Sequence, residues 1–275
     1  MINDFEEKNW RYDKFENFIW DNIAETALSE KERKSLIARP FSILREAAQK
    51  LRLTDKETDE KGKGSEIAEI VLYGIMRHHF NALPVVPKIF YKQNRQDNAK
   101  GSDSVHIVVD QNNNFTIWMG EAKFFNNIED SRLYEIVNSV SESLAIEKLK
   151  KENSIITSVS DINELDIDAG VKERIKKILD KDQSIDNLKP ILNVPILLLH
   201  ECLITRSCQS LSQEYKDEII NFHKQRAESY FKKQKNKISH LNLYTSINFH
   251  IILFPVPEKD KIVNTFITTV ENLRG

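Results

Sequence analysis

The sequence has few or none of the features that mark secreted, zinc-binding or membrane proteins. Cysteine occurs twice in 275 residues, at Cys202 and Cys208, and with His200 these give no recognisable zinc spacing. So few cysteines argue against a disulfide-stapled secreted domain and favour a reduced, cytoplasmic protein. No apolar run approaches the roughly 20 residues that span a bilayer. The N-terminal "MINDFEEKNWRYDKF" also has no signal-peptide character. We therefore expect no membrane insertion.

An excess of either charge is also missing. The 42 acidic and 40 basic residues leave a net charge of -2, so no overall positive field attracts nucleic acid. Any contact with DNA must then use a local patch. The segment "HKQRAESYFKKQKNK", residues 223–237, is such a candidate, with Lys232, Lys233 and Lys235 as possible DNA-binding residues. A solvated helix face explains the same pattern, and the absence of any base-reading motif predicts little sequence specificity.

The first part of the chain has helical periodicity. Apolar spacing predicts helices within residues 1–60, a loop at "TDKETDEKGKGS", and a further helix over "SEIAEIVLYGIMRHHF" beginning at Ser65. On that last helix the apolar side chains share one face, and a solvated face is expected for Glu66, Glu69, Tyr73 and Arg77.

Strands and helices alternate in the remainder. Extended segments are expected from Pro84 ("PVVPKIFYK"), Ser102 and Phe115, the last two joined by the turn "QNNN" as a hairpin. One helix over "DSRLYEIVNSVSESLAIEKLKKE" follows, and then come a strand from Val194, a charged helix over 212–238 and a strand from Ile247. The pattern predicts an α/β or α+β fold. We divide it into an N-terminal helical segment, residues 1–60, packed on a core formed by residues 61–275.

Two charges interrupt the apolar strand "TIWMGEAKFF". Glu121 and Lys123 are two residues apart, so they point to the same face of the strand. Buried charges need a partner or a metal ion. If the hairpin pairs residues whose numbers add to 224, Asp103 lies opposite Glu121 on that face, which requires a loop of three or five residues. Glu66 starts the preceding helix.

Converging carboxylates predict a cation. Several carboxylates cannot all stay ionised at close range without one, and hard oxygen ligands favour Mg²⁺ or Mn²⁺. A metal ion, a metal-activated water and a nearby ammonium are what phosphodiester hydrolysis needs. Asp103, Glu121 and Lys123 could supply these parts.

These residues carry a family resemblance. Glu66, then "GSD" with Asp103, then "GEAKF" with Glu121 and Lys123, resembles the PD-(D/E)XK nuclease superfamily, although Ser102 stands where that pattern has proline. More closely, "GKGSEIAEIVLYGIM", "KGSDSVHIVV", "WMGEAKFF", "VPILLLHE" and "HIILFPVP" resemble the HamA family, nuclease subunits of the Hachiman anti-phage defence system. The resemblance implies a restriction-endonuclease-like mixed sheet flanked by helices, with an α-β-β-β-α-β core and an N-terminal helical extension.

The same resemblance implies function. It implies a Mg²⁺-dependent (or Mn²⁺-dependent) DNA endonuclease controlled by an ATP-dependent helicase partner, HamB. Asp103, Glu121 and Glu66 would ligate the metal, with Glu69 in reserve, and Lys123 would act on the attacking water or the transition state. Three alternatives stay open. Glu121 and Lys123 can be a structural ion pair in a non-catalytic adaptor, Glu66 can simply stabilise a helix start, and the substrate can be RNA.

Overall fold

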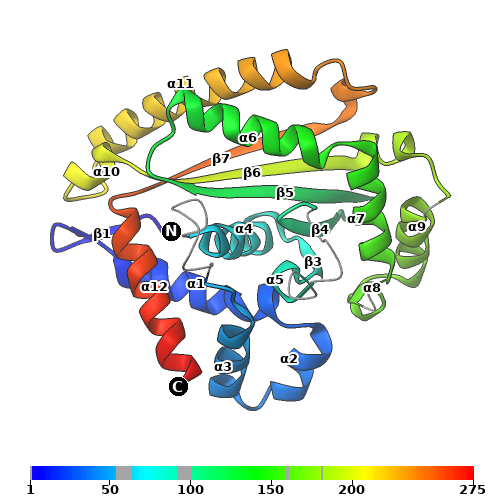
Figure 1. Cartoon of the computed structure of the whole chain (residues 1–275), viewed down its shortest axis with the longest axis horizontal. Helices are drawn as coiled ribbons and strands as arrows, with labels where there is room; N and C mark the ends of the chain where they lie inside the picture. The colour runs from blue at the N-terminus through cyan, green and yellow to red at the C-terminus, as the bar shows by residue number, and fades with distance from the viewer. Residues whose placement is uncertain (1, 54–63, 92–100, 159–160, 181) are drawn as a thin grey trace.

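The computed structural model describes residues 2–53, 64–91, 101–158, 161–180 and 182–275, and its centre is a five-stranded mixed sheet flanked by helices (Figure 1). The strands lie in sequence order: β3 (Leu83–Val86), β4 (Ser104–Val109), β5 (Phe115–Phe125), β6 (Leu192–Glu201) and β7 (Asn248–Val256). The pairs β3–β4 and β4–β5 are antiparallel, whereas β5–β6 and β6–β7 are parallel. The predicted α/β class is confirmed.

The β4–β5 hairpin has the register that places Asp103 opposite Glu121, one of those that the sequence allows. Ser104 pairs with Gly120 and Val109 pairs with Phe115, so the paired residue numbers add to 224. In the turn, the backbone N–H of Asp110 donates to the carbonyl of Asn114 at 2.9 Å, and the Asp110 carboxylate accepts two further turn N–H groups. The strands are therefore joined in the alignment that brings Asp103 toward Glu121.

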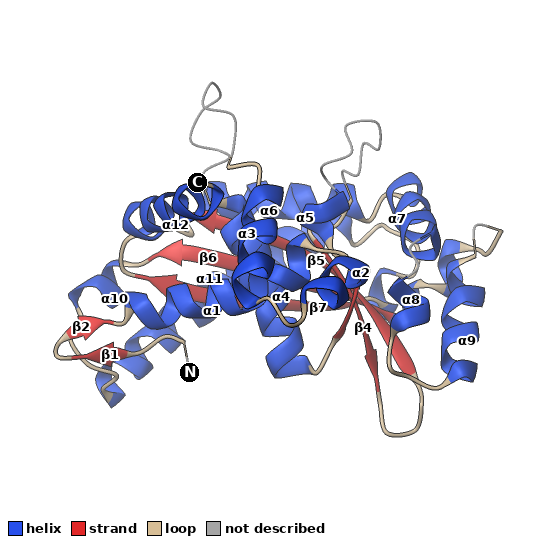
Figure 2. Cartoon of the chain, turned by 90° about the horizontal axis from the view of Figure 1, so that it is seen from below, coloured by secondary structure: helices blue, strands red, loops and turns tan. Residues whose placement is uncertain are grey.

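Two hydrophobic clusters cover the two faces of the sheet. Side chains of β5 alternate between them, with Ile117, Met119 and Phe125 in one cluster and Trp118, Ala122 and Phe124 in the other. Figure 2 shows helices on both sides of the strands. The first face is covered by α6 (Asp130–Ser143), α7 (Ile146–Ser158), α9 (Ala169–Leu179) and α11 (Gln213–Ile238), and the second by α1 (Tyr12–Ala27), α3 (Pro40–Lys50), α4 (Ser65–Phe80) and α12 (Lys259–Arg274).

The two ends of the chain meet on the second face. Arg274 in the last helix donates its Nε hydrogen to the carbonyl of Ala48 at 3.1 Å, and Thr269 donates to Glu16 at 3.1 Å. Smaller elements complete the described part of the chain: β1 (Phe5–Glu6), β2 (Asn9–Trp10), α2 (Glu30–Leu36), α5 (Lys88–Tyr91), α8 (Asp161–Glu164), α10 (Leu203–Ser207) and short 3₁₀ turns at Ile185–Asn187, Lys189–Ile191 and Tyr244–Ser246. No helix in the described ranges has the length and apolar character needed to cross a membrane.

Helix α4 is more deeply buried than its amphipathic pattern predicts. Glu69 is 6% exposed and Tyr73 is 1% exposed, so the expected solvated face is wrong for both residues. Tyr73 lies against the sheet, where its hydroxyl donates to the carbonyl of Val86 at 3.2 Å and its ring lies 4.3 Å from that of His106. Helix α1 packs on another side of α4, with Phe18 against Gly74. Helix α4 is thus enclosed between α1 and the strands.

Two other element boundaries differ from expectation. The segment from Pro84 is not extended throughout, because β3 ends at Val86 and α5 begins directly after Pro87, which has no N–H to continue the ladder. The single helix expected from residue 130 is two helices, since α6 ends at Ser143 and α7 begins at Ile146. Most of the predicted loop after Leu53 falls at 54–63, outside the described residues.

Candidate active site

The candidate site lies where β4 begins beside the middle of β5. Asp103 directly precedes β4, and two hydrogen bonds hold it to β5. Its backbone N–H donates to the carbonyl of Gly120 at 2.7 Å, and its carboxylate accepts the backbone N–H of Ala122 at 3.0 Å. Both the main chain and the side chain of Asp103 are therefore fixed relative to the strand that carries Glu121 and Lys123.

Lys123 brings a positive charge to this carboxylate. Its Nζ lies 4.0 Å from Oδ2 of Asp103, and the side chains of Lys123 and Asp103 are 30% and 14% exposed. Glu121 is only 4% exposed, although it shares the same face of β5 with Lys123. Solvent exposure thus increases across the site, from the buried carboxylate of Glu121 to the partly exposed ion pair of Asp103 and Lys123.

Glu121 is held from helix α6. Ser139 donates its hydroxyl hydrogen to Oε2 of Glu121 at 2.8 Å. Burial raises the pKa of Tyr230 on α11 above its usual range, and electrostatic repulsion of its phenolate by the nearby Tyr244 and Glu121 side chains raises it further, so the phenol keeps its proton. Its hydroxyl is buried and has no hydrogen-bond partner among the described residues. The sequence does not single out Ser139 or Tyr230 as part of the site, because both lie on other segments of the chain than Glu121.

The glutamates of α4 lie on the opposite face of the sheet. Both carboxylate oxygens of Glu66 accept backbone N–H groups from the segment after α3, from Arg52 at 2.9 Å and Leu53 at 3.2 Å. Glu69 is buried on the same helix. Glu66 therefore fixes the chain leaving α3, and its metal-ligand role stays a prediction.

Two of the predicted metal ligands share one region. Across the described ranges, no group of three or more histidine, cysteine, aspartate or glutamate residues is arranged to hold a metal ion. Mg²⁺ is commonly bound by only one or two carboxylates and completes its shell with water and substrate phosphate. Asp103 and Glu121 fit that donor set, and Glu66 is not gathered with them into a three-ligand group.

The histidine and cysteine residues of the β6 end form a different arrangement. Nε2 of His200 lies 3.0 Å from Nε2 of His223, and burial lowers the pKa of His200 to about 4 and that of His223 to about 3. His200 also donates through Nδ1 to the carbonyl of Glu201, so its Nε2 must accept from His223. The pair is neutral, and both cysteines are free thiols.

The three lysines of α11 that were predicted to bind DNA, Lys232, Lys233 and Lys235, differ in their surroundings. Lys233 forms an ion pair with Asp130 at 2.9 Å and lies over the ring of Tyr134 at 5.0 Å. The Asp130 carboxylate accepts hydrogen bonds from Lys233 and Arg226, and these lower the pKa of Asp130. Lys232 and Lys235 are exposed. The DNA-binding prediction therefore rests on the two exposed lysines, while Lys233 ties α11 to α6.

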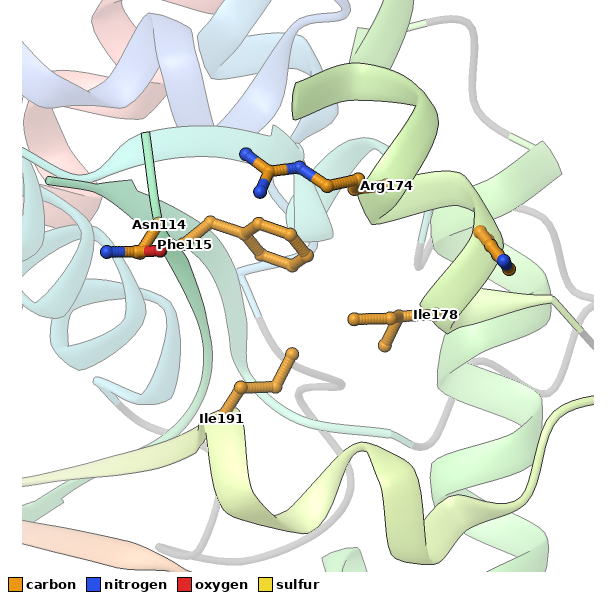
Figure 3. A pocket seen from close by; sticks show the side chains of 6 residues that line it. Asn114, Phe115, Arg174, Ile178 and Ile191 are labelled. Carbon is orange, nitrogen blue, oxygen red and sulfur yellow. The ribbon is translucent and has the colours of Figure 1, made fainter. Parts of the chain in front are cut away.

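Two hollows lie away from the carboxylates. One, of about 370 Å³, is at the start of β5, where Phe115, Ile178 and Ile191 line its wall and Arg174 lies at its rim (Figure 3). The other, of about 420 Å³, is at the ends of β5 and β6, where it is lined in part by His200 and Arg226. Neither is lined by Asp103, Glu121 or Lys123.

Comparison with known proteins identifies the family. The HamA family model matches residues 1–270 of the 275-residue chain. No curated protein matches the chain significantly. The chain belongs to the HamA family, as its motifs indicate.

Proposed function

Starting from membership of the HamA family, we propose that this chain is the metal-dependent DNA endonuclease subunit of a Hachiman anti-phage defence complex. The observation that carries the proposal is the β4–β5 register, which sets Asp103 beside Lys123 at 4.0 Å and next to Glu121. An aspartate before one strand and a glutamate and lysine two residues apart on the next match the PD-(D/E)XK pattern. The order of α4, β3, β4, β5, α6 and β6 is that of its α-β-β-β-α-β core, with α5 inserted after β3 and α7, α8 and α9 inserted after α6.

Each residue has a distinct task in this proposal. Asp103 and Glu121 would hold Mg²⁺ or Mn²⁺, which when bound polarises the scissile phosphate and acidifies a water molecule. Lys123 is partly exposed and positively charged, so it can stabilise the negative charge that develops on the phosphate. Ala122 and Ser139 hold the two carboxylates through hydrogen bonds of 3.0 and 2.8 Å, so little reorganisation is needed during reaction.

Control by a partner agrees with the charge of the chain. A net charge of -2 gives weak attraction for DNA, and Lys232 and Lys235 offer only a short exposed basic stretch. Recruitment by a HamB-like helicase would supply the missing affinity. Contacts limited to phosphates predict cleavage with little sequence specificity.

Plasmid cleavage tests the proposal. The purified chain, alone and with the helicase encoded beside it, is incubated with ATP and supercoiled DNA in Mg²⁺, in Mn²⁺ or in excess chelator. Metal-dependent cutting is expected, and Asp103→Asn and Lys123→Met should each reduce it at least 100-fold. Matched controls are Asp166→Asn, at an exposed residue, and Lys176→Met, at a partly exposed residue of α9 that pairs with Glu173. Both should leave cleavage unchanged. A parallel RNA substrate decides between the two nucleic acids.

An adaptor without catalysis is the second candidate. It is favoured by the fact that Glu121 already accepts from Ser139 and Asp103 already pairs with Lys123, as in a purely structural polar cluster. An adaptor predicts that Lys123→Met weakens folding or partner binding and that no DNA is cut by the wild type. Partner binding measured for the same variants separates the two accounts.

A further inference from the structure

A buried ion pair lies directly behind the segment that carries Asp103. Lys88 on α5 donates to Oε1 of Glu152 on α7, and both side chains are 2% exposed. Oε2 of Glu152 accepts the backbone N–H of Ser102 at 3.2 Å. One carboxylate therefore joins two helices to the residue that precedes Asp103.

Gly101 allows this close approach. A Cβ atom at position 101 would lie 1.9 Å from Oε2 of Glu152, well inside van der Waals contact. Glu152 cannot easily swing away, because its other oxygen is bound to Lys88 within the core. The glycine of "GSD" is thus required by the carboxylate packed against it.

The ion pair is poorly explained as a device for stability. Removing two charges from water costs free energy that their attraction only partly returns, and an apolar pair of similar volume is often as stable. What the pair supplies is geometry. The N–H of Ser102 is bound to Glu152, the N–H of Asp103 is bound to Gly120 at 2.7 Å, and the Asp103 carboxylate is bound to Ala122. The backbone before Asp103, the backbone of Asp103 and its carboxylate are thus each held by a hydrogen bond, which sets the direction of the Asp103 side chain.

We propose that Lys88 and Glu152 are positioning residues for the reaction, holding Asp103 in place through the backbone of Ser102. The inference rests on the proposed nuclease function. Neither side chain reaches the substrate, because both are buried. A displacement of about 1 Å in a reacting group can cost on the order of 100-fold in rate. Loss of the hydrogen bond from Ser102 to Glu152 should therefore lower the cleavage rate without changing DNA affinity.

Two double variants separate the hydrogen bond between Ser102 and Glu152 from the charges of the ion pair. Lys88→Met with Glu152→Gln and Lys88→Met with Glu152→Met both remove the ion pair at similar volume. Only the glutamine keeps an oxygen that accepts from Ser102. Amide-resolved hydrogen exchange is measured without metal, and single-turnover plasmid cleavage is measured with metal and partner. In the methionine variant we expect the amide of Ala122 to exchange at least 10-fold faster and cleavage to fall at least 10-fold, with unchanged DNA affinity and unchanged exchange in β6.

The two readouts separate this inference from the function on which it rests. Equal cleavage by the two variants, with or without a change in exchange, overturns the positioning role and leaves a structural pair. Equal exchange at Ala122 also overturns it. If the wild type cuts no DNA under any condition, the nuclease proposal fails, while the exchange comparison still shows whether Glu152 fixes Asp103. Matched thermal unfolding of the two variants ensures that the comparison is made between folded proteins.

Discussion

Ser139 on α6 donates its hydroxyl hydrogen to Oε2 of Glu121 at 2.8 Å, which joins the helix that follows β5 to the most buried carboxylate of the candidate site. A hydrogen bond to a charged group contributes roughly 1.5–3 kcal/mol. Ser139→Ala should therefore lower the free energy of unfolding by about that amount and reduce DNA cleavage at least 10-fold. Urea unfolding and plasmid cleavage measure the two effects.

Ser143 on the same helix provides the control for Ser139. Its hydroxyl donates to the carbonyl of Val140 within the helix and does not contact the site. Ser143→Ala should therefore leave cleavage at the wild-type rate. Equal loss of cleavage in both variants would show that α6 is merely destabilised and that the bond to Glu121 has no specific role.

Gly101 should not tolerate a methyl group. The Cβ of Gly101→Ala would meet Glu152 at 1.9 Å, so Glu152 or the backbone beside Asp103 must move. Overpacking of this kind costs about 1–3 kcal/mol. We expect that loss in urea unfolding, together with at least a 10-fold fall in cleavage. At Gly170, in helix α9, the nearest atom would be an Asp168 oxygen at 3.0 Å, so Gly170→Ala should have little effect on cleavage.

The exposed lysines of α11 predict a salt-dependent effect on DNA binding. Each phosphate contact contributes a slope of about 0.9 to the dependence of log affinity on log salt. Lys232→Gln with Lys235→Gln should weaken DNA binding and lower that slope by about 2. Lys233→Gln should instead reduce stability, because Lys233 is bound to Asp130. Fluorescence anisotropy over a salt series checks this, and a slope that is unchanged in the double variant would remove α11 from the DNA-binding surface.

His106 makes folding sensitive to acid. Burial lowers the pKa of His106 to about 3, and the ring lies 4.3 Å from that of Tyr73 with no hydrogen-bond partner among the described residues. In the unfolded chain a histidine takes up a proton below about pH 6.5, whereas the folded chain does not. Stability must then fall as the pH decreases from about 6.5 toward about 3, by at most roughly 1.4 kcal/mol per pH unit for one histidine.

Replacing His106 by leucine should make that slope shallower. Urea unfolding at pH 7, 6, 5 and 4.5 compares the wild type with His106→Leu. The slope should not vanish, because burial also lowers the pKa of His200 and of His223. Identical slopes for the two proteins would mean that His106 is protonated in the folded state.

The strand with the candidate site could be predicted from the sequence because its signals are local. The alternation in "TIWMGEAKFF" places Glu121 and Lys123 on one face, and the turn after Asp110 limits the hairpin to a few registers, one of which brings in Asp103. The burial of Glu69 and Tyr73 could not be predicted, because it depends on tertiary packing of a face of α4 that reads as polar, as in the contact of Tyr73 with His106 on β4.

The contacts of Ser139, Lys88 and Glu152 could not be predicted from the sequence either, because they too depend on tertiary packing. Ser139 reaches Glu121 from a different helix, and Lys88 meets Glu152 across 64 positions of the chain. Ser139 and Glu152 lie in a segment expected to be helical and Lys88 lies in one expected to be extended, and none of the three carries a local signal of these contacts. Lys88 and Glu152 are both buried, and their pairing offsets part of the cost of removing two charges from water.

The most direct test of the account is plasmid cleavage by Glu121→Gln, in complex with the helicase partner, ATP and Mg²⁺, beside the wild type and Glu135→Gln. Glu135 is an exposed glutamate on α6 paired with Arg132, so it matches the substitution without touching the site. We predict that Glu121→Gln folds, binds the partner and loses at least 100-fold in cleavage, while Glu135→Gln cuts like the wild type. Cleavage by Glu121→Gln at the wild-type rate would contradict the claim that Glu121 belongs to a catalytic site.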